Sequence, residues 1–154
     1  TSEMRGVARA LAEKLAAPGG IEASRLPVKP DWAVTGDDLA RYDVVAVGNP
    51  ATNWVLAAAA RAKGGLPVTF ERDALVLGGK RYVGRDVGCA FAVPSPFAPG
   101  RALVVYAGVG PAGLGLARHL PRYLPDYVVW DRGLATAIGG AVLGDRDVLA
   151  AGFF

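Results

Sequence analysis

Three glycines form the part of this sequence whose spacing most directly suggests chemistry. They are Gly108, Gly110 and Gly113, in the pattern Gly-x-Gly-x-x-Gly, and Asp131 follows 18 residues after the last of them. In dinucleotide-binding folds such glycines let the backbone approach a pyrophosphate. The N-terminus of the next helix attracts its negative charge, and an acidic residue holds a ribose hydroxyl. The motif therefore predicts a nucleotide-binding or dinucleotide-binding site as one hypothesis.

The same glycines also have a purely structural interpretation, in which they permit a tight turn and a close approach of a helix to a sheet. Only 23 residues follow Asp131, too few for the remaining strands of a full cofactor domain, although other strands could come from upstream. We therefore expect no cofactor as the leading interpretation. A nucleotide or dinucleotide at Gly108, Gly110, Gly113 and Asp131 is the alternative.

The sequence contains no complete set of residues for nucleophilic catalysis. An α/β-hydrolase needs its serine in a Gly-x-Ser-x-Gly turn, and the serines, at positions 2, 24 and 95, lie in no such pentapeptide. The single histidine, His119, falls in a helical stretch without a positioned nucleophile or acid, which favours a surface or helix-end role over that of a base. Thr1 is a candidate N-terminal nucleophile of a self-processed amidohydrolase, with its own amine as the base. A threonine left at a proteolytic boundary is the alternative.

Composition excludes several other classes. The 17 Lys and Arg residues exceed the 14 Asp and Glu residues by three and are spread along the chain, so no basic arm predicts nucleic-acid binding. No apolar run is long enough for a membrane span. Cys89 is the only cysteine, which excludes an internal disulfide and any multi-cysteine metal site. The acidic group of Asp37, Asp38 and Asp43 is explained by helix capping and a strand start, so we predict no metal.

The elements that must position these residues can be outlined from periodicity. Apolar positions from Met4 to Ala16 recur at helical spacing, and a short extended piece follows at 26–28. Thr35 begins one or two helical turns, the apolar run 43–48 predicts a buried strand, and Asn53 can cap a helix over 54–63.

The second half is richer in strands. Three short strand-like runs over residues 66–83, with a two-glycine turn at 78–79, predict an antiparallel β-hairpin insertion. Further strands are expected at 89–93, 102–107, 127–130 and 147–151, with a helix after the glycine loop and a glycine-rich loop at 139–144. Strands that alternate with helices predict a single α/β domain over 1–154, with three layers and a largely parallel sheet, flavodoxin-like or Rossmann-like.

One element of such a domain is expected but not found in the sequence. A strand normally leads into the first helix, whereas here the helix opens the chain with Thr1 rather than an initiator Met. We therefore expect the chain to be a C-terminal piece of a longer polypeptide. We also expect a β-strand from outside residues 1–154, or from a second copy, to pair near the first helix, since an unfilled sheet edge exposes unpaired backbone groups.

Segments along nearly the whole chain resemble, in order, the region that follows the catalytic domain in bacterial prolyl-oligopeptidase-like serine hydrolases, peptidases and esterases of the α/β-hydrolase type. They are 28–31, 34–42, 44–53, 66–68, 77–80, 94–101, 124–127 and 151–154. The resemblance implies that the nucleophile, acid and histidine lie in a separate, earlier domain, and that this region contributes no catalytic residue. It also points to an exported bacterial protein. The glycine-rich stretch 108–115 departs from the pattern, which leaves room for a ligand.

These considerations give one leading hypothesis for function and two alternatives. The leading one is a non-catalytic accessory α/β domain of a larger serine-hydrolase-like protein, acting in packing, assembly or substrate access. The first alternative is a nucleotide-binding domain that uses the glycine loop. The second is the self-processed amidohydrolase with Thr1 as nucleophile.

Overall fold

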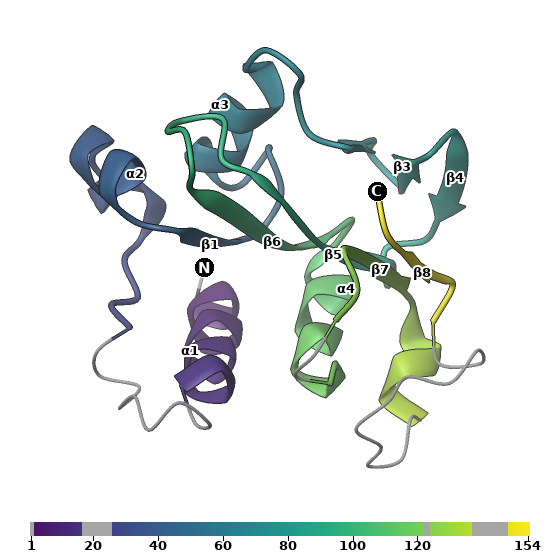
Figure 1. Cartoon of the computed structure of the whole chain (residues 1–154). Helices are drawn as coiled ribbons and strands as arrows, with labels where there is room; N and C mark the ends of the chain where they lie inside the picture. The colour runs from purple at the N-terminus through teal and green to yellow at the C-terminus, as the bar shows by residue number, and fades with distance from the viewer. Residues whose placement is uncertain (1, 17–25, 122–123, 137–147) are drawn as a thin grey trace.

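The computed structural model describes residues 2–16, 26–121, 124–136 and 148–154 (Figure 1). Its helices and strands follow one another as α1 (Ser2–Ala16), η3 (Asp31–Ala33), α2 (Gly36–Arg41), β1 (Val44–Val47), α3 (Trp54–Arg61), β2 (Val68–Phe70), β3 (Ala74–Leu77), β4 (Lys80–Val83), β5 (Gly88–Pro94), β6 (Ala102–Gly108), α4 (Pro111–Gly115), η4 (Leu116–His119), β7 (Tyr127–Trp130), η5 (Arg132–Thr136) and β8 (Ala150–Gly152). Within these ranges no helix is long and apolar enough to cross a bilayer. The glycine-rich loop expected at 139–144 lies outside the described residues.

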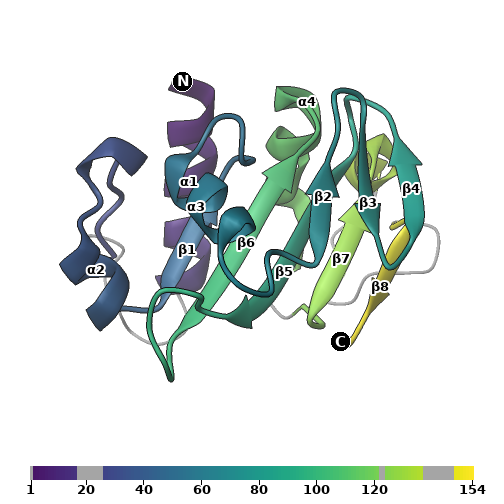
Figure 2. The same cartoon turned by 90° about the horizontal axis from the view of Figure 1, so that it is seen from above.

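The main sheet has five strands in the order β1-β6-β5-β7-β8, as Figure 2 shows from above. Only β1 and β6 pair in parallel, with Val44 opposite Leu103. The pairs β5–β6, β5–β7 and β7–β8 are antiparallel. The prediction of a largely parallel, three-layer sheet of flavodoxin-like or Rossmann-like type is therefore wrong.

The reason for the difference lies in the connection between β5 and β6. Parallel neighbours need a crossover of a dozen or more residues, usually with a helix. Only residues 95–101 separate the two strands, and Ser95 N donates to Arg101 O at 2.7 Å across the turn. These residues form a hairpin loop, so β5 runs antiparallel to β6.

The antiparallel insertion predicted at 66–83 is confirmed as a three-stranded sheet in the order β2-β3-β4. Leu77 pairs with Lys80 around a two-residue turn. Gly78 and Gly79 adopt φ values of +58° and +78°, which side chains rarely tolerate and which a hairpin turn with the correct twist requires.

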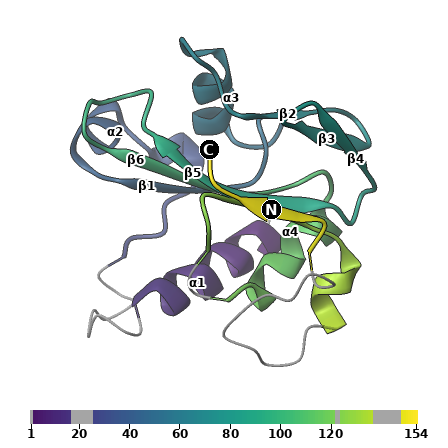
Figure 3. The same cartoon turned by 45° about the vertical axis from the view of Figure 1, so that its right-hand side comes forward.

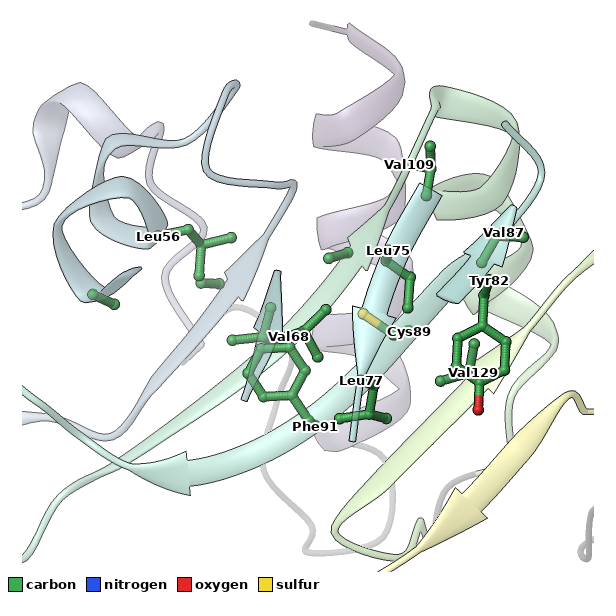
Figure 4. Packing of buried hydrophobic residues seen from close by; sticks show 14 of the residues in the cluster. Leu56, Val68, Leu75, Leu77, Tyr82, Val87, Cys89, Phe91, Val109 and Val129 are labelled. Carbon is green, nitrogen blue, oxygen red and sulfur yellow. The ribbon is translucent and has the colours of Figure 1, made fainter. Parts of the chain in front are cut away.

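The five-stranded sheet has other helices and strands on both of its faces (Figure 3), and an apolar core lies on each face. One face packs against α3 and the three-stranded sheet through residues such as Leu56, Leu75 and Phe91, and Figure 4 shows this cluster from close by. The other face packs against α1, α4 and η4, with Val7, Leu11 and Trp130 among its members. The two faces are called here the α3 face and the α1 face.

The predicted helix caps are confirmed. The Thr35 side chain accepts from Asp38 N, and the Asp38 carboxylate accepts from Thr35 N, which completes a capping box. The Asn53 side chain accepts from Val55 N and Leu56 N at the start of α3. These caps fix the first residues of α2 and α3, the helices that precede and follow β1 along the chain.

Candidate functional site

The glycine loop lies at the carboxyl end of β6, where the chain turns into α4. Because β6 and β7 are both antiparallel to β5, and β1 is parallel to β6, the carboxyl ends of β1, β6 and β7 share one edge of the sheet. The structure thus brings Gly108, Gly110, Gly113 and Asp131 to the same edge. The strand β5 nevertheless lies between β6 and β7, so Asp131 does not follow a strand adjacent to the loop.

The space over the glycines is filled by the chain that enters β5. A Cβ atom added at Gly110 would lie 2.7 Å from Arg85 O, and one added at Gly113 would lie 2.1 Å from Val87 O. At Gly108 the added atom would meet Leu114 N at 2.4 Å, within the loop's own helix. The three glycines are therefore needed for close packing of backbone on backbone, as the structural interpretation holds.

Two amide groups in the first turn of α4 are engaged by the protein itself. Gly113 N donates to Arg85 O at 3.3 Å, Leu114 N donates to Gly110 O at 3.2 Å, and Pro111 has no amide hydrogen. Trp130, fully buried, donates from its indole nitrogen to Gly113 O at 2.9 Å. A pyrophosphate at this loop would have to displace these contacts, so the geometry gives no support to the nucleotide hypothesis.

Asp131 also has a structural partner. Its carboxylate accepts from Gly133 N at 2.8 Å, and its carbonyl accepts from Leu134 N, which holds the start of η5. This is the local turn that aspartate commonly forms with backbone two residues on.

The candidate catalytic residues are not brought together. His119 is exposed at the end of η4, where its Nε2 accepts from Arg118 Nε at 3.1 Å. Among the described serines, Ser2 is exposed on α1 and Ser95 accepts from Phe97 N in the hairpin loop. Neither is bonded to the histidine. Thr1, the candidate terminal nucleophile, lies outside the described residues.

The remaining titratable groups act structurally. Burial raises the pKa of the Cys89 thiol, which favours a role as a small buried hydrophobic side chain over one as a reactive thiolate. The hydrogen bond from Lys29, together with those from Thr35, lowers the pKa of Asp38 to about 2. Asp37 pairs with Arg41, and Asp43 accepts from Ala102 N. Within the described ranges no three metal-ligating side chains gather.

A cleft of about 630 Å³ lies between the turn after β1 and the β2 region, lined by Asn49, Leu66, Phe70 and Arg72 among others. Two of its polar side chains are held by the protein itself: Asn49 donates to Gly108 O and accepts from Ala51 N, and Glu71 pairs with Arg81 at 2.7 Å. The cleft has no group positioned for catalysis.

The strand β1 forms one outer edge of the five-stranded sheet and contacts α1, whereas the sequence predicted an unfilled edge near the first helix without saying which strand would carry it. The sequence predicts a strand buried on both faces here, yet Val45 is 44% exposed. In the parallel ladder Gly48 N donates to Tyr106 O at 2.9 Å. By the two-residue alternation of a strand, Val45 and Val47 therefore direct their amides away from β6. Asn53 Nδ2 donates to the outward Val47 O at 3.2 Å, but within the described part of the chain the two amides have no partner.

Comparison with known proteins gives no assignment: no family model matches the chain, and neither a curated protein nor a solved structure is significantly similar to it.

Proposed function

We propose that this chain is a non-catalytic accessory domain of a larger serine-hydrolase-like protein. It acts by packing on, or completing, a neighbouring part of that protein while the chemistry takes place elsewhere. The proposal has two sources, the ordered resemblance of its segments to the region appended to prolyl-oligopeptidase-like hydrolases and the geometry described above.

The observation that carries the proposal is the unpaired edge at β1. An exposed strand edge is a liability that stable proteins normally cover. Here it carries the exposed side chain of Val45 and two amides without partners among the described residues. A partner that supplies a β-strand would relieve this edge, and the polypeptide of the hydrolase domain is the partner that the resemblance implies.

Two further observations support a binding rather than a catalytic role. Trp32 is 80% exposed, although its element is held in place by the bond from Trp54 N to Asp31 Oδ2 at 2.9 Å. An exposed tryptophan on an ordered element is typical of a contact surface. The described serines and His119, by contrast, form no nucleophile–base pair.

The test uses a fluorophosphonate probe, which reacts with activated serines. The gene sequence upstream of Thr1 is read, and the full polypeptide and residues 1–154 are treated with the probe. We expect labelling of the full polypeptide at a Gly-x-Ser-x-Gly serine upstream, and none on residues 1–154. Removal of residues 1–154 should lower the melting temperature of the hydrolase and leave kcat on a small ester within about twofold. Labelling of Ser2, Ser24 or Ser95, or an upstream region without a hydrolase, would refute the proposal.

A further inference from the structure

We infer that the added strand lies directly beside β1, runs parallel to it, and occupies a position between β1 and the segment 26–30. This inference rests on the proposed function, in that the hydrolase-bearing polypeptide supplies the strand. The proposed function names the β1 edge, and this inference adds the direction of the strand, its place relative to the segment 26–30, and its apolar character on both faces.

The hydrogen-bonding groups define where the strand pairs. The inward positions of β1, at Val44, Ala46 and Gly48, belong to the ladder with β6. The outward amides of Val45 and Val47 are spaced two residues apart, as the donors of one strand edge are. The other end of the sheet, at β8, offers only three residues, and Phe154 beside it is tied to Asp126 by its amide at 3.1 Å. A further strand is therefore more readily added beside β1 than beside β8.

The direction follows from where α1 begins. Met4, in the first turn of α1, lies under Gly48 at the carboxyl end of β1: its Cε is 2.7 Å from the position of a Cβ at Gly48. From there α1 runs back under β1, as Figures 1 and 2 show. A strand that leads directly into α1 must therefore end near the carboxyl end of β1. It runs parallel to β1.

Handedness places this strand on the outer side of β1. Parallel strand–helix–strand units are right-handed in nearly all known cases. The helix α1 packs on the α1 face, whereas η3 contacts α3 and lies with α2 on the α3 face (Figures 1 and 3). The segment 26–30 and α2 lie beyond the edge of β1 (Figure 2). Residues 26–30 form no strand in the structure, but a strand placed between them and β1 gives the chain a right-handed turn at both steps: through α1 to 26–30, and from 26–30 through α2 to β1.

The surroundings of this position indicate that the added strand is apolar on both faces. Both faces of this position have a helix layer nearby, which is typical of parallel strands that are apolar on both sides. Val45 and Val28, which are 44% and 41% exposed, would be covered on either side of it. A second folded copy would first meet α2 and the segment before it, because these flank the edge. A single strand does not need that space.

The experiment joins a probe strand to residues 1–154. The segment Lys-Phe-Val-Leu-Val-Val-Gly-Asp is fused before Thr1, and amide hydrogen exchange is followed by NMR in fused and unfused protein. We expect exchange of the Val45 and Val47 amides to slow about 100-fold or more, because each gains a backbone acceptor. The amide of Ala151, which faces outward at the far edge, should not change, because Ala150 and Gly152 lie opposite Val129 and Tyr127 and direct their amides into the ladder with β7. A fusion with two prolines in place of the second and fourth probe residues is the matched control and should not slow exchange.

Two variants separate pairing from a general gain in stability. Val45→Pro removes one outward donor, and proline is tolerated where an edge amide faces solvent; we expect the fused strand to protect Val47 about tenfold less in this variant. Val45→Ala keeps the amide and should retain the protection, which covers the case in which the proline variant does not fold.

Several results would overturn the inference. They are unchanged exchange at Val45 and Val47, protection at β8 instead, equal protection by the proline control, and concentration-dependent protection in unfused protein, which would indicate a second copy. The probe strand carries no hydrolase, so failure here leaves the fluorophosphonate result unaffected. An upstream region without a hydrolase would refute the function without affecting the exchange data.

Discussion

Substitution of Gly113 by alanine tests the closed packing of the glycine loop. Gly113 lies inside α4 with an ordinary helical backbone, so alanine by itself would favour the helix by about 1 kcal/mol. The added Cβ, however, would lie 2.1 Å from Val87 O and 2.6 Å from Val87 C. These are backbone atoms that cannot rotate away, so α4 must move by about 1 Å from residues 85–87.

The cost of this movement can be estimated from the bonds that cross the contact. Gly113 N to Arg85 O is already 3.3 Å long and would break, and Trp130 Nε1 to Gly113 O would be strained. Two such bonds contribute about 1 kcal/mol each, and overpacking adds about 1–3 kcal/mol. After the gain in helix propensity, we expect Gly113→Ala to lower the free energy of unfolding by about 2–4 kcal/mol.

The assay is urea and thermal unfolding followed by circular dichroism, with Gly6→Ala as the matched control. Gly6 is also helical, but nothing lies within 4 Å of its added Cβ. The control should therefore gain up to about 1 kcal/mol, whereas Gly113→Ala should melt about 5–15 °C lower. If Gly113→Ala has the same melting temperature as the wild type, the loop has room above it, and the packing argument against a ligand fails.

Other substitutions and titrations test neighbouring parts of the structure. Trp130→Phe should lower the free energy of unfolding by about 2–3 kcal/mol, because Gly113 O loses its buried donor; a urea midpoint equal to that of the wild type would contradict this. Because the pKa of folded Asp38 is about 2, below its ordinary 3.8, the stabilisation from its bonds is complete above about pH 4 and is lost as pH falls toward 2. Urea midpoints at pH 6 and pH 2.5 should therefore differ less in Asp38→Asn than in the wild type. The Cys89 thiol should react with an aromatic disulfide reagent only after denaturation, since it is buried, and rapid reaction of the native protein would show otherwise. Calorimetry with NAD, FAD or ATP at millimolar concentration should give no binding heat; saturable binding that Gly110→Ala abolishes would restore the nucleotide hypothesis.

Local patterns in the sequence were sufficient for the turns and caps. The Thr35 and Asn53 caps and the Gly78–Gly79 hairpin depend on residues within three or four positions of one another, where physical preferences are strong. The strand at β5 was also predictable as buried. Its direction was not read from the apolar pattern, because that pattern is the same for a parallel strand and for an antiparallel one covered on both faces. The direction follows instead from the connection 95–101, which is too short for a parallel crossover.

The candidate site shows a different limit. The pattern from Gly108 to Gly113 with Asp131 is compatible with a ligand or with protein against the same glycines. What decides between them is the position of Arg85 and Val87, which belong to a connection that no local signal places over the loop. The exposure of Val45 likewise depends on what lies beyond β1, a property of the tertiary arrangement.

The β5–β6 hairpin has a consequence for the order of folding. Its seven register pairs close a short loop, so little chain entropy is lost when they form. The β1–β6 pair has four register pairs and joins segments more than fifty residues apart. We therefore expect the hairpin to form in the transition state and β1 to dock late. The strand beside which a partner would add is then the last of the sheet to become ordered, so the nascent chain can recruit that partner before its own edge is set.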